Sequence, residues 1–331
     1  MIGLRRYPVL DDEVNHMLEV LDRGFPAVET MSVGQARAAV AARRPPVGNV
    51  DDVARTDDLT VPAADGHVIP VRVYHPHPPD AAGAGAPSAI VFAHGGGFVL
   101  CSIESHDSFC RAMARGCGAV VISVDYRLAP EARAPRAAED VYDVLSWAVA
   151  AGSPLTIDPS RIAVAGDSSG GNLAAATALL ARDRGAPALA AQVLLYPALD
   201  PKCDSPSYDE FADEHFNTAA AMHWYWENYL GPGRDPDGGR FPAQYAAPSC
   251  ADDLTGLAPA VLVLAGRDPL HDEGARYAER LAGQGVPVTC REYPDLFHGF
   301  ATIMAFAPGA SARELLWSDL SVRLRAGSRH A

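Results

Sequence analysis

The chain has 331 residues, 48% of them hydrophobic, which is enough to bury the core of one large α/β domain with an insertion or of two ordinary domains. Its formal net charge of −14 argues against a nucleic-acid-binding protein, because such a protein presents a basic face. No apolar stretch reaches the ~18 residues that a membrane-spanning helix needs.

The N-terminus and the cysteines bear on where the protein works. Residues 1–8 lack an apolar h-region and a small-residue cleavage site, so we expect no signal peptide. The six cysteines show no C-x-x-C spacing, which argues against a metal site, and a chain of this length does not need a disulfide framework. We therefore expect free, buried thiols in a cytoplasmic protein. The cysteines are Cys101, Cys110, Cys117, Cys203, Cys250 and Cys290.

The first part of the chain is predicted to be helical and then to form a hairpin. Between residues 11 and 21, apolar side chains recur with the i, i+3, i+4, i+7 spacing of an amphipathic helix. Residues 68–74 have the pattern of a strand, and the Asp65-Gly66 turn before them predicts a hairpin with a strand near Leu59. The Pro/Ala/Gly-rich residues 76–87 are predicted to be a surface loop.

From residue 89 onward, short apolar strands alternate with helices. Continuous apolar strands separated by helices indicate a largely parallel sheet that is covered on both faces. The strands are expected at 89–93, 119–124, 161–165, 191–195, 261–265 and 288–292, and the helices between them at 105–116, 135–151 and 172–184.

Residues 196–259 interrupt the alternation, and an insertion of this size is most simply a lid or cap. It contains one clear helix at 218–230, followed by Gly/Pro/Asp-rich loops at 231–239. Three bulky side chains share one face of that helix, and we expect them to pack onto the body of the protein, with the lining of an acyl pocket as the alternative. They are Met222, Trp226 and Tyr229.

The most informative motif is Gly166-Asp-Ser-Ser-Gly170, which lies between a predicted strand and a predicted helix. That order is typical of a nucleophile elbow, in which a sharp turn presents Ser168 at the N-terminus of the helix. The two glycines let the turn close tightly. The alternative is a glycine-rich loop whose serine only caps the helix. A trypsin-like protease is disfavoured, because its triad runs in the order His, Asp, Ser on an all-β fold.

A candidate for the oxyanion hole is His94-Gly-Gly-Gly97, directly after the strand at 89–93. Glycines let backbone N–H groups approach a substrate oxygen closely. A further N–H is expected from Ser169, the residue after the nucleophile. We expect His94 itself to be structural and to hold this loop.

Asp268 and His298 are the candidate acid and base. Asp268 follows the strand at 261–265 closely, although it can also be interpreted as a helix N-cap before Pro269. His298 follows the last predicted strand, on a loop bounded by Pro294 and Gly299. The resulting order Ser, Asp, His is the one that α/β-hydrolases use.

Five motifs in this order resemble those of the bacterial hormone-sensitive-lipase-like esterases, and the resemblance covers the chain from about residue 55. It implies an α/β-hydrolase fold with a mostly parallel central sheet, helices on both faces and a helical cap. The motifs are His94-Gly-Gly-Gly97, Asp125-Tyr-Arg-Leu-Ala-Pro-Glu131, Gly166-Asp-Ser-Ser-Gly-Gly171, Asp268-Pro-Leu-His-Asp-Glu-Gly274 and His298-Gly-Phe300.

The resemblance also implies a function. It predicts a carboxylesterase for small-molecule esters of short to medium acyl chains, without a metal or organic cofactor, and it leaves a homodimer open. Ser168 would be the nucleophile, His298 the base and Asp268 its partner. The oxyanion donors would be Gly96, Gly97 and Ser169.

The expected division of the chain is an N-terminal helical cap segment at 1–50, a first part of the catalytic core at 51–195, a cap insertion at 196–259 and a second part of the core at 260–331. Ser169 stands where the family usually has Ala, and Arg267 before the acid is also unusual. Arg127 and Glu131 are expected to pin a loop by hydrogen bonds. Two alternatives stay open: an acyltransferase or an amide or lactone hydrolase on the same scaffold, and a non-catalytic ligand receptor.

Overall fold

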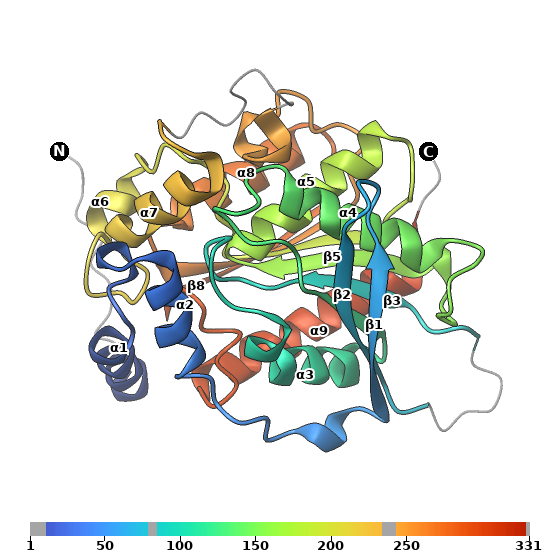
Figure 1. The fold of residues 1–331 in the computed structure, drawn as a ribbon, viewed down its shortest axis with the longest axis horizontal. Helices are drawn as coiled ribbons and strands as arrows, with labels where there is room; N and C mark the ends of the chain where they lie inside the picture. Colours follow the sequence, from blue (N-terminus) through green and yellow to red (C-terminus); the bar gives the residue numbers. More distant parts are fainter. Residues whose placement is uncertain (1–10, 79–84, 234–242, 329–331) are drawn as a thin grey trace.

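The computed structural model describes residues 11–78, 85–233 and 243–328. The N-terminal residues and parts of the predicted loops at 76–87 and 231–239 lie outside the described residues. A twisted eight-stranded sheet runs through the middle of the molecule, with helices on both faces (Figure 1). Within the described residues, no helix is both long enough and apolar enough to span a membrane.

The sheet confirms the predicted architecture. Its strand order is β1-β2-β4-β3-β5-β6-β7-β8, with β1 and β2 forming the expected antiparallel hairpin, β2 pairing antiparallel with β4, and the remaining neighbours parallel. The strands are β1 (Arg55–Pro62), β2 (Val68–His75), β3 (Ala89–Ala93), β4 (Val120–Val124), β5 (Ile162–Asp167), β6 (Ala191–Leu195), β7 (Ala260–Arg267) and β8 (Val288–Phe297).

The helices explain why the central strands are continuous apolar runs. In Figure 1, α3 and α9 lie below the sheet, and α4, α5 and α8 lie above it. Every residue of β3, β4, β5 and β6 is buried as a result. These helices are α3 (Asp107–Cys117), α4 (Arg136–Val149), α5 (Ser169–Asp183), α8 (His271–Gly283) and α9 (Pro308–Ala326).

The first described segment of the chain forms α1 (Asp12–Gly24) and α2 (Val33–Ala41), at the left of Figure 1. The helix predicted from residue 11 is confirmed, and it continues three residues beyond the predicted end. Asp11 begins it by accepting a hydrogen bond from the Glu13 N–H, and Ser32 with Gln35 forms a capping box at the start of α2.

The interruption of the sheet at 196–259 contains α6 (Pro206–Glu210) and α7 (Ala219–Leu230). Met222, Trp226 and Tyr229 are buried, and the Phe98 ring stacks on Tyr229 with centroids 3.9 Å apart. The prediction that these three side chains pack onto the body is therefore confirmed. The four-part division of the chain into cap and core stays a prediction.

Three local predictions need correction. β8 extends to Phe297 rather than ending at Glu292, because a register shift against β7 absorbs Pro294 at the edge of the sheet, where a proline is tolerated. His298 therefore follows the strand directly. α5 begins at Ser169, three residues earlier than predicted. None of the six cysteines, all of which lie in the described residues, forms a disulfide, but only Cys110 and Cys203 are buried as predicted. Cys101 and Cys117 are half-buried, and Cys250 and Cys290 are exposed.

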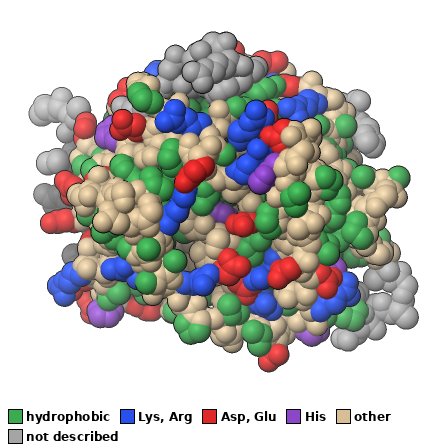
Figure 2. All heavy atoms as spheres, viewed as in Figure 1, with side chains coloured by type: hydrophobic (Ala, Val, Ile, Leu, Met, Phe, Trp, Pro, Cys, Tyr) green, Lys and Arg blue, Asp and Glu red, His purple; other side chains and the backbone are tan. Residues whose placement is uncertain are grey.

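Charged side chains of both signs are intermingled over the face shown in Figure 2.

Two ion pairs hold the loop after β4 in place, as expected. The Arg127 guanidinium donates to both carboxylate oxygens of Asp140, which is fully buried. Glu131 binds Arg37 of α2 through both of its oxygens, and Arg37 also donates to the Val99 carbonyl. The second pair ties the N-terminal segment to the core.

Breaking the ion pair between Arg127 and Asp140 should lower the stability of the protein. Arg127→Met leaves the buried Asp140 carboxylate without its partner, so we expect the free energy of unfolding in urea to fall by about 3 kcal/mol. The control is Arg136→Met, because Arg136 is half exposed and its ion pairs are worth less than about 1 kcal/mol. Equal losses in the two variants would contradict this assignment.

Candidate active site

The turn after β5 has the geometry of a nucleophile elbow. The backbone of Ser168 adopts φ 56° and ψ −121°, a conformation that residues other than glycine rarely adopt. The surrounding structure holds the backbone in this conformation. Its backbone N–H donates to the Leu195 carbonyl of β6 at 2.8 Å, and α5 begins with the next residue. The hydroxyl is thereby lifted above the carboxyl edge of the parallel strands.

Two glycines make the turn sterically feasible. A Cβ atom on Gly166 would lie 2.2 Å from the carbonyl oxygen of Gly170, and one on Gly170 would lie 2.0 Å from the carbonyl oxygen of Ala93. Both distances are far inside van der Waals contact. Glycine at these positions therefore lets β5, α5 and the end of β3 pack backbone against backbone.

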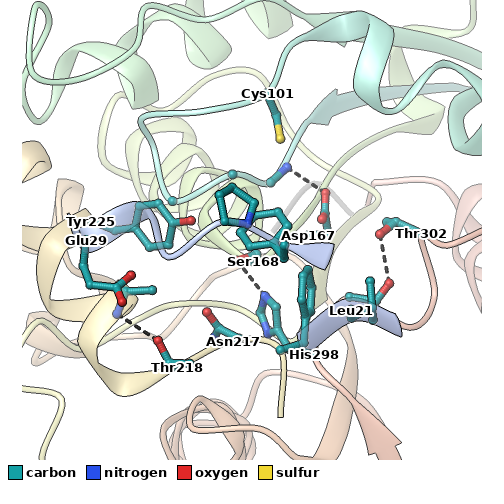
Figure 3. A pocket seen from close by; sticks show the side chains of 18 of the residues that line it. Leu21, Glu29, Cys101, Asp167, Ser168, Asn217, Thr218, Tyr225, His298 and Thr302 are labelled. Atoms are coloured by element: carbon teal, nitrogen blue, oxygen red, sulfur yellow. Dashed lines mark hydrogen bonds between the residues drawn. The ribbon is translucent and has the colours of Figure 1, made fainter. Parts of the chain in front are cut away.

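The three predicted triad side chains meet above this edge. His298 Nε2 lies 2.9 Å from Ser168 Oγ, and His298 Nδ1 lies 2.6 Å from Asp268 Oδ2. Because an ionised carboxylate can only accept, Nδ1 carries the proton and Nε2 is free to accept one from the serine. All three side chains are buried. Figure 3 shows the imidazole of His298 turned toward Ser168.

Asp268 has two partners, one for each carboxylate oxygen. Oδ2 binds His298, and Oδ1 accepts the backbone N–H of Leu270 at 3.0 Å. The residue at the N-cap of α8 is Leu270, so the interpretation of Asp268 as the cap of that helix is wrong. The bond to Leu270 holds the carboxylate in place. Glu273, one turn further on, is buried. Burial raises its pKa well above the ordinary value, and its carboxylate accepts the Leu199 N–H.

The loop from His94 to Gly97 lies beside the nucleophile. Gly96 and Gly97 have φ values of +120° and +61°, and a Cβ atom on Gly97 would lie 2.1 Å from the Tyr225 ring. His94 holds the loop, as expected: its Nδ1 binds the Gly95 carbonyl, and its own carbonyl accepts the Tyr126 hydroxyl. Burial, followed by the charge of a neighbouring histidine, lowers the pKa of His94 to about 4, so it is neutral.

Ser169, the third predicted donor, begins α5 and is fully buried. It is not among the residues that line the cavity over Ser168, so its extra hydroxyl lies within the protein rather than at the substrate position. The side chain of Arg267 is likewise absent from that lining.

A cavity of about 270 Å³ opens over Ser168 and His298. Several residues that line the cavity were not predicted from the sequence. Leu21 comes from α1 and Phe25 follows its last residue, while Tyr225 comes from α7, next to Trp226 of the predicted apolar face. Figure 3 shows Tyr225 and Glu29 side by side on one wall. Only the tertiary fold brings these segments over the sheet edge.

Comparisons with known proteins agree with this geometry. A family model described as alpha/beta hydrolase fold matches residues 90–302. The chain belongs to this family. It is 38% identical over 305 residues to carboxylesterase NlhH of Mycobacterium tuberculosis, covering 92% of each chain. It is also 38% identical to an ethyl acetate hydrolase of Pseudomonas putida, over 76% of this chain and 78% of that protein.

Solved structures support the same placement. The hyperthermophilic esterase of the archaeon Pyrobaculum calidifontis superposes with a TM-score of 0.83 at 36% identity, covering 95% of this chain and 99% of that one. Both the predicted α/β-hydrolase fold and the predicted membership among the hormone-sensitive-lipase-like esterases are confirmed.

The backbone contact at the elbow gives a direct test. In Gly170→Ala, the new methyl group collides with the Ala93 carbonyl, so we expect a loss of about 3 kcal/mol of stability together with a loss of esterase turnover. The matched control is Gly152→Ala, where nothing lies within 4 Å of the added Cβ, and the change in stability should stay within about 0.5 kcal/mol. Urea unfolding and hydrolysis of p-nitrophenyl acetate measure both quantities. A stable, fully active Gly170→Ala protein would refute the close approach.

Proposed function

We propose that this protein is a serine carboxylesterase that hydrolyses small-molecule esters of short to medium acyl chains through an acyl-enzyme intermediate. The observation that carries the proposal is the continuous hydrogen-bonded chain from Asp268 through His298 to Ser168. The relatives named as an ethyl acetate hydrolase and a carboxylesterase support the reaction class.

In the acylation step, Ser168 Oγ attacks the ester carbonyl carbon while His298 Nε2 accepts the hydroxyl proton. The imidazolium that forms is stabilised by the Asp268 carboxylate, which also keeps the proton on Nδ1. His298 then donates its Nε2 proton to the leaving alcohol. The alcohol departs and leaves an ester between Ser168 and the acyl group.

Deacylation repeats the sequence with water as the nucleophile. His298 takes a proton from the water as it attacks the acyl carbon, and returns that proton to Ser168 Oγ as the C–O bond to the enzyme breaks. The products are a carboxylic acid and the free enzyme. An acceptor alcohol in place of water would give acyl transfer, which the same residues could support.

Each tetrahedral intermediate carries a negative oxygen that must be stabilised. The backbone N–H groups of Gly96, Gly97 and Ser169 are the proposed donors, since they come from the glycine loop and from the N-terminus of α5, both beside Ser168. Loss of one such donor costs about 3–4 kcal/mol of transition-state stabilisation in comparable enzymes.

A homodimer is a further proposal, and gel filtration with light scattering measures the oligomeric state.

Removing the nucleophile is the first test. Ser168→Ala should lower turnover of p-nitrophenyl acetate by at least about 10³-fold, because the acyl-enzyme cannot form. We also expect an organophosphonate to increase the mass of the wild-type protein and to leave the mass of Ser168→Ala unchanged. Ser160→Ala, at an exposed serine, serves as the control and should keep both the turnover and the labelling of wild type. Retention of turnover in a folded Ser168→Ala protein would rule out the proposed role.

Chain length is the second test. The cavity over Ser168 measures about 270 Å³, which suits a short acyl chain. Across a series of p-nitrophenyl esters, we expect kcat/KM to peak at short to medium chains and to decline beyond them. A maximum beyond about ten carbons would contradict the proposed substrate range, because such a chain exceeds a pocket of this size.

A further inference from the structure

A buried pair of a carboxylate and a histidine contacts the glycine loop and plays no part in the steps above. Asp167, the residue before the nucleophile, is 4% exposed, and its Oδ1 accepts the Gly95 N–H at 2.8 Å. His106 is 8% exposed, and its Nε2 lies 3.2 Å from Oδ1 and 3.3 Å from Oδ2 of the same carboxylate. Figure 3 shows the bond between Asp167 and the loop.

His106 is held between two partners. Its Nδ1 lies 2.8 Å from Ser105 Oγ, a pair in which either atom can donate. Its Nε2 faces a carboxylate that can only accept, so Nε2 carries a proton and donates it to Asp167.

His106 is the main polar partner of the buried Asp167 carboxylate. Burial alone would raise the pKa of Asp167, but its interaction with His106 holds the pKa below its ordinary value. The other titratable groups that interact with this carboxylate are a neutral histidine, two thiols and two phenols. They are His94, Cys101, Cys110, Tyr126 and Tyr196.

The glycine loop is in close contact with this pair. A Cβ atom on Gly95 would lie 2.5 Å from Asp167 Oδ2, so the backbone of the loop rests against the carboxylate. Next to it, the ring of His94 stacks on that of His106 with centroids 5.7 Å apart. The carboxylate belongs to the residue that precedes Ser168. One side chain therefore connects the strand that carries the nucleophile with the loop that would carry the oxyanion donors.

We propose that His106 is a positioning residue for the reaction: its hydrogen bond holds the Asp167 carboxylate and thereby fixes Gly95, and with it the donors Gly96 and Gly97, relative to Ser168. This inference rests on the proposed esterase function and adds a residue to it. Small displacements of groups around a reacting atom are expensive, and can cost about 10²-fold in rate. His106 acts on the rate through Asp167 and the loop.

The bond from His106 to Asp167 can be observed in the unmodified protein. In ¹⁵N-histidine-labelled wild type, we expect one ring whose Nε2 proton exchanges slowly with water, and this signal should be missing from His106→Gln. This readout reports the hydrogen bond, and it does not depend on activity. A His106 ring without a proton on Nε2 would overturn the proposal.

Kinetics test the consequence. His106→Gln removes the Nε2 group that holds the buried Asp167 carboxylate, so kcat should fall by about 10- to 100-fold while KM changes by less than about threefold. In the double variant His106→Gln, Asp167→Asn, the charge is gone and the Asn oxygen can still accept the Gly95 N–H. We expect the double variant to regain at least about tenfold in kcat over the single one.

The matched control is His75→Gln. His75 also pairs with a carboxylate, at 2.9 Å from Asp57, but it lies on the β1–β2 hairpin and does not line the cavity. Its kcat should equal that of wild type. A purely steric role for His106 predicts a double variant no better than the single one, and that result would overturn the proposal. Loss of turnover in Ser168→Ala tests the esterase function separately, so the two can fail independently.

Discussion

The backbone contact between the elbow and the end of β3 is the constraint on which the site depends. At Gly166 and Gly170 there is no room for a side chain, since a Cβ atom would fall about 2 Å from a neighbouring carbonyl oxygen. The contact places the nucleophile of one strand next to the glycine loop that follows the adjacent strand, β3. Asp167 extends the same junction, because its carboxylate binds that loop from the residue before Ser168. Nucleophile and proposed oxyanion donors are thus parts of one rigid unit.

The acid and the base come from two strands further along the sheet, β7 and β8, beyond β6. Asp268 follows β7 and His298 follows β8, and these two strands are parallel neighbours, so both side chains emerge at the same edge as Ser168. The register shift between the strands lets β8 continue past Pro294. His298 is therefore held by a strand end, and Asp268 by its second bond to Leu270. Rigid elements on both sides leave little positional freedom to the reacting groups.

The wall of the cavity is built differently from its floor. The floor is strand ends and tight turns, whereas the wall comes from α1 and α7, segments far apart in the chain. Arg37 fastens the N-terminal segment to the core through Glu131 and two backbone carbonyls. The wall is held to the core through side-chain contacts, whereas the floor is held by backbone contacts that leave no room for a side chain. Substrate preference is therefore expected to depend on the wall, and the chemistry on the floor.

Local patterns in the sequence were sufficient for the elbow, the parallel sheet and the order Ser168, Asp268, His298, because a glycine-bounded turn and a continuous apolar strand follow from nearest-neighbour sterics and burial. They also led to the family. The tertiary structure alone decided that Tyr225 rather than Met222 faces the cavity, that β8 carries His298 to the edge, and that His106 meets Asp167. Each of these depends on the relative placement of segments tens of residues apart. That placement is set by the packing of whole helices and strands and produces no periodic pattern in the sequence.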